Sequence, residues 1–294
     1  MLIKPIRKKK NELQDAFEAL DAERVKALLA AGADKRRRIR NEMLMKCIGE
    51  TCYESNAKNT KCMKLLLANG ANPNWIDPNP SWFDTPLLES LMYYNFEQAQ
   101  ILVDNGARVD RSTLGEPLFT FLAGRLDGQF AAMKFLYKNG ANINIKDDQG
   151  RTGLMRVCGF DDVLEPCIFD DTKWIVAPVE FLVSHGAKVN LRDKSGKTAL
   201  AHSLTQKWGR WDNCICDEDD DYEYAEAKDN FSATFYYEIP KILLSNGARV
   251  GIKDKSGKDA LAHAAADEEK MDLFARAIDD SNKFLRRKIV VMSR

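Results

Sequence analysis

Histidine is scarce in this sequence, and the scarcity limits the catalytic chemistry that the chain can carry. The three histidines stand at positions 185, 202 and 263 of 294 residues. His202 and His263 occupy equivalent places in two similar stretches, so duplication explains them without an active site. Ser203 beside His202 has no partner that spacing alone identifies, and no glycine-rich phosphate-binding string is present. The sequence therefore predicts no catalytic residues and no cofactor, and we expect a protein that is not an enzyme.

Long hydrophobic runs are also missing. No apolar stretch approaches the roughly 20 residues that a membrane-spanning helix needs. The basic segment Met1–Lys10 lacks the continuous apolar region of a secretory signal. The seven cysteines are an odd number without the spacing of a disulfide framework, which favours reduced thiols. We expect a cytoplasmic protein that has no membrane partner and is a monomer by itself.

An excess of charge of one sign is the third absence. The chain has 44 basic and 44 acidic residues, so nothing draws it as a whole toward nucleic acid. Its basic clusters, Met1–Lys10 and Arg36–Arg40, are not interleaved with stacking aromatics, and we expect no nucleic-acid partner. The segment Asp217–Asp229 is strongly acidic, with eight acids against Lys228. Cys214 and Cys216 lie beside it, but a single ligand pair does not make a zinc site, and EF-hand spacing is missing. A solvated acidic loop without a metal is the prediction.

What the sequence does contain is a repeat. Six Gly-Ala dipeptides each follow a short apolar run, and their glycines stand at positions 32, 70, 106, 140, 186 and 247. In the clearest example, Gly186 can take the left-handed conformation that ends a helix. Asp193–Gly196 then has the residues of a tight turn, and Thr198 can cap the helix that starts at Ala199. Each interval therefore predicts a helix end, a hairpin and a new helix.

The repeat resembles a known family. The pattern Gly-Ala-x-Val-Asn-x-x-Asp-x-x-Gly-x-Thr fits Gly140–Thr152 and Gly186–Thr198. Gly247–Asp259 follows it with Gly251 in place of Asn and Asp259 in place of Thr. Thr85–Gly106 has the Thr-Pro-Leu opening and the Leu-x-x-x-Gly-Ala type of ending. On these residues the chain is similar to ankyrin repeats, units of about 33 residues made of a hairpin and two antiparallel helices. The resemblance implies an all-α repeat solenoid of about seven units with hairpin loops.

The chain departs from the family pattern at its histidines. The family has a histidine directly after the leucine of its opening motif, where this chain has Leu88, Ala201 and Ala262. Because the family uses that imidazole to tie neighbouring hairpins, we expect looser hairpins here. His202 and His263 stand one place later, where an ankyrin helix faces the concave side, and we expect both at the partner surface.

Two intervals, of 46 and 61 residues, exceed the family period and indicate insertions. They are predicted between the two helices of a unit, near 159–173 and 208–234, with a shorter one near 49–59. A last helix pair is predicted at 260–266 and 268–278. The resulting domain prediction is a basic N-terminal segment (1–10), the repeat domain (11–280) and a C-terminal cap or tail (281–294).

The resemblance also implies where a partner would bind, because ankyrin arrays usually grip proteins with hairpin tips and first-helix faces. The corresponding tip residues are Lys146, Asp148, Gln149, Arg192, Lys194, Ser195, Lys253, Lys255 and Ser256. Trp75, Trp82 and Phe83 lie in a proline-stiffened hairpin, where they are candidates to anchor a partner. The alternative is that Trp82 or Phe83 folds back as local core. Met92 and Tyr93 occupy variable positions of the inner helix face. Tyr94 replaces a usual glycine, and we expect it to pack.

The acidic insertion offers a second predicted surface. Its aromatic content favours partial packing over the repeats and leaves one acidic run exposed to a basic partner: Asp217, Glu218, Asp219, Asp220 and Asp221. We expect a non-enzymatic adaptor or inhibitor that binds another protein through its concave face and hairpin tips. Two alternatives remain open from the sequence: a delivered effector whose array targets a host protein, and an enzyme with a site on the 208–234 insertion that would depend on Cys214 and His202.

Overall fold

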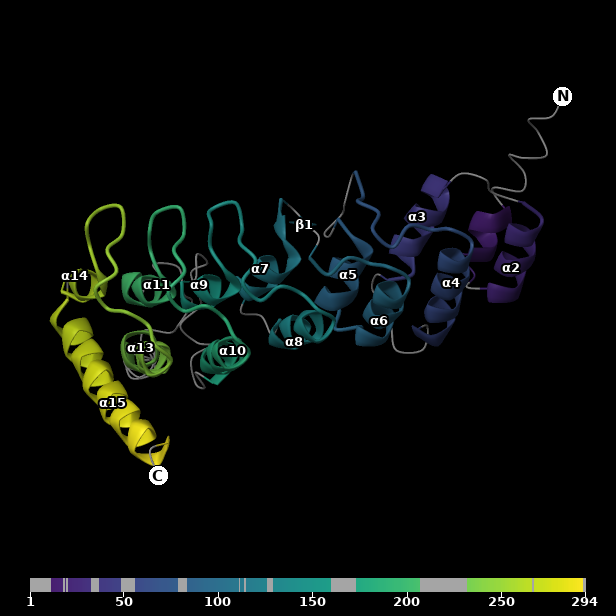
Figure 1. Cartoon of the computed structure of the whole chain (residues 1–294). Coiled ribbons are helices and arrows are strands. Elements are labelled where there is room, and N and C mark those ends of the chain that lie inside the picture. Colours follow the sequence, from purple (N-terminus) through teal and green to yellow (C-terminus); the bar gives the residue numbers. More distant parts are fainter. Residues whose placement is uncertain are drawn as a thin grey trace, which may run out of the picture. The chain divides into compact units, whose positions relative to one another are not determined.

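The computed structural model describes most of the chain. The described residues are 12–17, 19, 21–32, 37–48, 56–78, 84–110, 112–113, 115–125, 129–159, 173–206, 232–265 and 267–292. Antiparallel helix pairs follow one another along them, and glycine-containing turns and hairpins join the pairs (Figure 1). The chain divides into two compact units, here called unit 1 (residues 1–118 and 134–141) and unit 2 (residues 119–133 and 142–294).

Unit 1 contains the first helices and a short two-stranded hairpin. After the helical residues 12–17 come α2 (Ala22–Ala30), α3 (Arg37–Lys46), α4 (Asn56–Ala68), α5 (Pro86–Met92) and α6 (Phe96–Asp104). The strands β1 (Ser112–Thr113) and β2 (Glu116–Pro117) pair antiparallel, with Ser112 opposite Pro117. Helix α4 packs against α2 and α3, while α5 packs against α6 and α3. These contacts bury leucines such as Leu44, Leu66 and Leu91 completely.

The helices α7 (Leu118–Ala123) and α8 (Phe130–Lys138) each contain a boundary between the two units, after residues 118 and 133. Unit 2 then holds α9 (Gly153–Cys158), α10 (Lys173–Ser184), α11 (Ala199–Thr205), the π-helix η2 (Ala233–Glu238), α13 (Ile239–Ser245), α14 (Ala260–Ala264) and α15 (Glu268–Met292). The short first helices α9, α11 and α14 pack in sequence, and α10 and α13 pack behind them. Phe119, Phe235 and Phe274 are the largest completely buried side chains of this unit. Each helix pair thus supplies part of its neighbour's core.

Helix ends follow the predicted chemistry. All six glycines of the Gly-Ala dipeptides have positive φ, between 71° and 91°, and Gly186 has φ 91°. Its amide donates to Val183 O, and the amide of Ala187 donates to Leu182 O, which satisfies carbonyls at the end of α10. At helix starts, Thr198 accepts from the amide of Ala201, and Asp259 takes the same role toward Ala262. The prediction that Thr198 caps a helix is confirmed.

The last helix is longer than expected from the sequence analysis above. Helix α15 was expected to end at Ile278, but it continues to Met292. Its apolar stripe is maintained beyond Ile278, and no glycine or proline interrupts it. The helix packs on α13, η2 and α14, so its length is supported by tertiary contacts.

The three predicted insertions fall mainly outside the described residues. The flanking helices are α3 and α4 for the first, α9 and α10 for the second, and α11 and η2 for the third. The undescribed segments between them are 49–55, 160–172 and 207–231. The terminal segment 1–10 also lies outside the described residues.

Candidate partner-binding surface

Three hairpins of unit 2 have the same internal structure, centred on an aspartate. They are residues 145–152, 191–198 and 252–259, and they stand side by side next to α9, α11 and α14 (Figure 1). We call these three hairpins the hairpin row. In each hairpin the aspartate amide donates to the carbonyl four residues later, as from Asp193 to Lys197 at 3.0 Å. The carboxylate oxygen Oδ1 accepts from that later amide, at 2.9 Å for Lys197 N. Asp147 and Asp254 make the equivalent bonds, so each side chain closes its own turn.

The second carboxylate oxygen of each aspartate holds a basic side chain of the same repeat. Asp147 Oδ2 accepts from Arg151 Nε at 2.8 Å. Asp193 Oδ2 lies 2.9 Å from His202 Nε2, and Asp254 Oδ2 lies 2.8 Å from His263 Nε2. We call this pair of an aspartate and its basic partner the Asp lock. The locks of Asp193 and Asp254 join a hairpin tip to the first turn of the helix that follows it.

This geometry changes the interpretation of two predicted partner residues. His202 and His263 were expected to face a partner, but their side chains are only 13% and 10% exposed. Their Nε2 atoms are occupied within their own repeats. The shift of the histidine by one position therefore replaces one structural tie by another, and we assign both residues to hairpin stability.

The Asp locks keep two carboxylates ionised. Burial by itself would raise the pKa of Asp193, but hydrogen bonds from His202, Ser195 and the amide of Lys197 outweigh it and hold the pKa well below the ordinary value. For Asp254 the hydrogen bond from Ser256 is the largest cause, and with the bonds from His263 and two amides it lowers the pKa despite burial. Both aspartates thus carry a stable negative charge inside the hairpins.

Neighbouring hairpins are also bonded to one another. The amide of Lys194 donates to Gln149 O at 2.8 Å, and the amide of Lys255 donates to Ser195 O at 2.9 Å. The Arg192 guanidinium donates to Lys253 O at 2.8 Å. The expectation of looser hairpins is therefore wrong for unit 2. Backbone hydrogen bonds join neighbouring hairpins, and the Asp locks of Asp193 and Asp254 join each hairpin to its helix, without the family's histidine.

An asparagine before each of the first two hairpins bonds to the following repeat. Asn144 Oδ1 accepts from the amide of Lys188 at 2.8 Å, and Asn190 Oδ1 accepts from the amide of Arg249 at 2.9 Å. Asn190 Nδ2 also donates to Gly247 O at 2.8 Å. The corresponding position in the last hairpin is Gly251, and no further Gly-Ala loop follows it in the sequence. The departure at Gly251 thus marks the end of this asparagine ladder.

The predicted tip residues of unit 2 lie on the surface. All nine are exposed: Lys146, Asp148, Gln149, Arg192, Lys194, Ser195, Lys253, Lys255 and Ser256. The first-helix face beside them offers less, because α9 and α11 are largely buried, whereas α14 exposes Leu261 and Ala262. The hairpin tips are thus the main accessible surface that the repeats of unit 2 share.

The aromatic hairpin of unit 1 differs in length. It closes with the same type of bond, from the amide of Asp77 to Asp84 O at 2.8 Å, but six residues lie between these two positions instead of three. Trp75 is partly buried and Ile76 is 45% exposed. Trp82 and Phe83 lie outside the described residues, so their two roles remain predictions.

Helix α5 of unit 1 ends in two exposed tyrosines. Met92 is partly buried, Tyr93 is 39% exposed and Tyr94 is 47% exposed. The expectation that Tyr94 packs is therefore wrong. Tyr94 has φ 55°, which makes it the single described residue other than glycine with positive φ. It keeps the positive φ of the usual glycine and remains about half exposed, at a conformational cost of about 1 kcal/mol.

Glu89 of α5 in unit 1 has a perturbed carboxyl group. Burial, together with the nearby charge of Asp77, raises its pKa to about 7.

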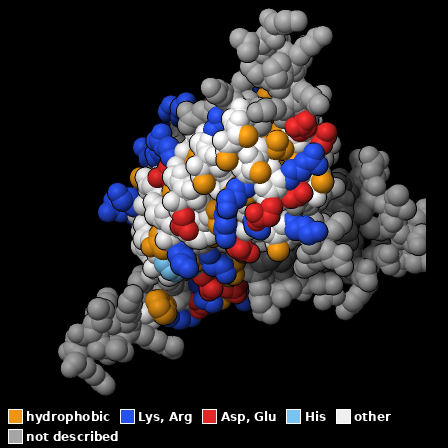
Figure 2. Space-filling model, turned by 90° about the vertical axis from the view of Figure 1, so that its right-hand side faces the viewer, with side chains coloured by type: hydrophobic (Ala, Val, Ile, Leu, Met, Phe, Trp, Pro, Cys, Tyr) orange, Lys and Arg blue, Asp and Glu red, His pale blue; other side chains and the backbone are white. Residues whose placement is uncertain are grey.

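On the face shown in Figure 2, acidic and basic side chains lie next to one another with scattered hydrophobic side chains between them. In unit 1 the pairs Lys61–Glu23 and Arg38–Glu42, at 2.9 and 2.8 Å, have this mixed character.

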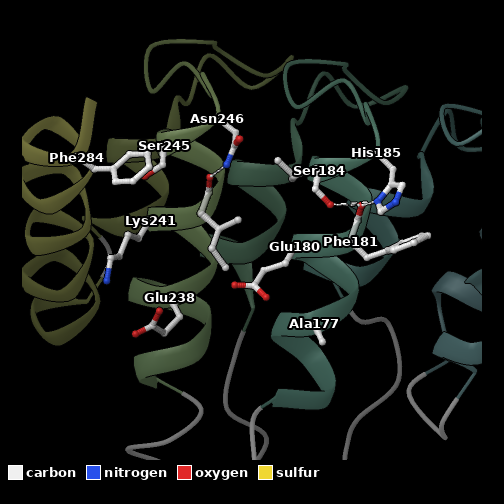
Figure 3. Close-up of a pocket in the computed structure, with 12 residues that line it drawn as sticks. Ala177, Glu180, Phe181, Ser184, His185, Glu238, Lys241, Ser245, Asn246 and Phe284 are labelled. Carbon is white, nitrogen blue, oxygen red and sulfur yellow. Dashed lines mark hydrogen bonds between the residues drawn. The ribbon is translucent and has the colours of Figure 1, made fainter. Parts of the chain in front are cut away.

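Unit 2 also has a groove between its second helices that the sequence did not reveal. It has a volume of about 630 Å³ and lies between α10 and α13, with Phe284 of α15 at its end. Figure 3 shows Glu180 extending from α10 toward α13, while the ring of His185 lies against that of Phe181 with centroids 4.2 Å apart. The long interval between Gly186 and Gly247 hid the pairing of these helices. The groove is lined by charged side chains of both signs, and nothing in the structure identifies an occupant.

The ends of the acidic insertion are held by one buried cluster. Tyr236 Oη donates to Gln206 O at 3.0 Å, directly across the undescribed segment 207–231. Lys270 is 7% exposed and donates to Leu204 O and Gln206 O, and its Nζ lies 4.4 Å from the centre of the Tyr236 ring. The predicted acidic run Asp217, Glu218, Asp219, Asp220 and Asp221 lies outside the described residues.

Comparisons with known proteins agree with this architecture. Residues 44–147 match the family model of ankyrin repeats (three copies). Among solved structures, an ankyrin repeat domain from Acinetobacter baumannii AYE is 19% identical, with 80% of this chain and 96% of that chain covered and a TM-score of 0.54. The human ASB11 ankyrin repeat domain is also 19% identical, with 90% and 96% covered and a TM-score of 0.54. No curated protein matches the sequence.

The chain has the ankyrin repeat fold, and the predicted resemblance is confirmed. Ankyrin repeats generally serve as protein–protein interaction modules, and the family is typically non-enzymatic. Within the described part of the chain, no cluster of three or more potential ligands could hold a metal ion. None of the described helices combines the length and the apolar character needed to cross a membrane.

Proposed function

We propose that this protein is a non-enzymatic binding module that holds a partner protein on the hairpin row and adjoining first-helix face of unit 2. The observation that supports it most directly is the bonding between hairpins: amides of Lys194 and Lys255 donate to the preceding hairpins. A surface ordered before binding loses little conformational entropy when a partner docks. The exposed tips are thus held in place for recognition by side chains.

Because the hairpins are bonded to each other through their backbones, a partner strand has few free backbone groups to pair with. The backbone donors of Lys194 and Lys255 are already used. Recognition therefore depends on the exposed side chains of the tips and on those of α14, such as Leu261. This binding mode suits an adaptor or an inhibitor that acts by occupying part of its partner's surface.

The test is affinity capture from the native lysate with a variant that blocks this surface without changing its charge. Gln149→Trp with Ala262→Trp places bulk on an exposed hairpin tip and on exposed α14. Ala68→Trp with Ala275→Trp adds the same bulk at exposed positions of α4 and α15. The blocked variant should lose a protein that wild type and control both retain. Retention of the same proteins by all three baits would contradict the proposal.

A further inference from the structure

The hairpin row of unit 2 is strongly basic at its surface. Across 146–152, 188–198 and 249–259, the exposed cations are Lys146, Lys188, Arg192, Lys194, Arg249, Lys253, Lys255 and Lys258. The one exposed carboxylate of these stretches is Asp148. We call these eight cations the basic row.

The aspartates of the same hairpins do not neutralise this surface locally. The side chains of Asp147, Asp193 and Asp254 are between 3% and 6% exposed and face Arg151, His202 and His263. Counted over all three stretches, ten cations stand against five carboxylates, a formal net charge of +5. The Asp locks thus turn negative charge inward, while the lysines project outward.

The basic row has no carboxylate partner within the described residues. Lys146 Nζ donates to Arg192 O at 2.9 Å, and Arg192 donates to Gly196 O and Lys253 O. These acceptors are neutral carbonyls, so they orient the cations and leave their charge uncompensated. In unit 1, by contrast, Lys61 and Arg38 form ion pairs with glutamates. A row of uncompensated cations on an ordered scaffold attracts a ligand of opposite charge.

We infer that the basic row binds an acidic, extended segment of the partner protein, an inference that rests on the function proposed above. The cations come from three successive hairpins, so they favour a ligand whose carboxylates recur along its length. Nucleic acid fits less well, because the three stretches contain no aromatic residue on which a base could stack.

The direct test measures binding of a fluorescein-labelled decaglutamate peptide to the full chain at low salt. The row variant is Lys194→Glu, Lys253→Glu and Lys255→Glu. The control variant is Lys26→Glu, Lys46→Glu and Lys64→Glu, three exposed lysines of unit 1 that give the same change in net charge. The row variant should weaken binding about tenfold or more, the control about twofold or less, and binding to wild type should fall as salt rises.

Three results would overturn the inference. Equal losses in both variants would mean that net charge alone attracts the peptide. Tighter binding of an oligothymidine of matched charge would assign the row to nucleic acid. Self-association of the wild type at low salt that the row variant abolishes would assign it to the acidic segment of a second copy.

Capture of the natural partner by two variants distinguishes a failure of this inference from a failure of the proposed function. If the bulky variant Gln149→Trp with Ala262→Trp loses the captured protein but the row variant retains it, the function holds and the acidic partner is wrong. If the captured protein survives both changes, the proposed function itself fails. Loss in both variants, with release by salt, supports the two together.

Discussion

The hairpins of the two units solve the same geometric problem in different ways. In unit 2, the Asp locks of Asp193 and Asp254 close three-residue turns and bind a histidine of the following helix. In unit 1, the turn between Asp77 and Asp84 is longer and directly follows Trp75 and exposed Ile76. The comparison shows that the regular, internally bonded hairpins present charged side chains outward, whereas the described part of the longer one exposes the apolar Ile76.

The carboxylates of the two units also differ, because their pKa values are shifted in opposite directions. In unit 2, hydrogen bonds hold the pKa values of Asp193 and Asp254 below the ordinary value. In unit 1, burial and the charge of Asp77 raise the pKa of Glu89 to about 7. Acid should therefore weaken the hairpins of unit 2 and relieve strain in unit 1, and the following variants test this contrast.

The largest effect is expected from Asp193→Ala. It removes the acceptor of Ser195, Lys197 N and His202, and the last two of these donors are partly buried. We expect a loss of about 2–4 kcal/mol in the free energy of unfolding, measured by urea titration with circular dichroism. Asp148→Ala, at an exposed tip of the same row, should change it by less than about 0.5 kcal/mol. Equal effects would mean that the Asp lock adds nothing to stability.

Gly196→Ala tests how tightly neighbouring hairpins pack. Gly196 has φ 87°, and an added Cβ would lie 2.9 Å from Lys255 N of the next hairpin. We expect a loss of about 1–3 kcal/mol because both backbone conformation and close approach are violated. Gly257→Ala is the matched control, since Gly257 also has positive φ, 82°, but nothing lies within 4 Å of its added Cβ. A Gly196→Ala protein as stable as this control would argue against a tightly bonded row.

Glu89→Gln tests the opposite pH response of unit 1. Because the pKa of Glu89 is raised from 4.5 to about 7, its contribution to stability is full below pH 4.5 and is lost as pH rises through 7. The variant should be about 1 kcal/mol more stable than wild type at pH 8 and no more stable at pH 4.5. The depressed pKa values of Asp193 and Asp254 act in reverse, since their contribution is present above the ordinary value and lost as pH falls below it. A pH-independent difference for Glu89→Gln would contradict this assignment.

The smallest effect is expected from Tyr94→Gly. Glycine removes the cost of φ 55°, but it also gives the unfolded chain more freedom. The two terms nearly cancel, and unfolding stability should change by less than about 0.5 kcal/mol. Tyr94→Val should destabilise by about 1 kcal/mol or more, because a β-branched residue tolerates positive φ poorly. If Tyr94→Gly instead costs as much as Tyr94→Val, the tyrosine ring itself contributes to the fold.

The repeat was predictable because its signals are local. Gly186 and Thr198 decide a helix end and a helix start from backbone conformation and a single side-chain bond. The exposed tips followed from the same register. The family resemblance therefore placed Lys194 and Lys253 on the surface before any packing was known.

The roles that sequence reasoning missed depend on packing between repeats. His202 lies nine residues after Asp193, and only the folded hairpin brings its ring to the carboxylate. Tyr94 was expected to pack, but it follows the end of α5 with positive φ and is 47% exposed. The groove beside Phe284 needs α15 to extend beyond Ile278, a length set by contacts with α13 and η2.

Lysine acetylation with and without the captured partner, mapped by mass spectrometry, tests the central claim most directly. The account predicts that Lys146, Lys194, Lys253 and Lys255 lose reactivity in the complex while Lys26 and Lys64 of unit 1 keep theirs. Unchanged reactivity of the four hairpin lysines, with protection at Lys241 beside the groove instead, would contradict it.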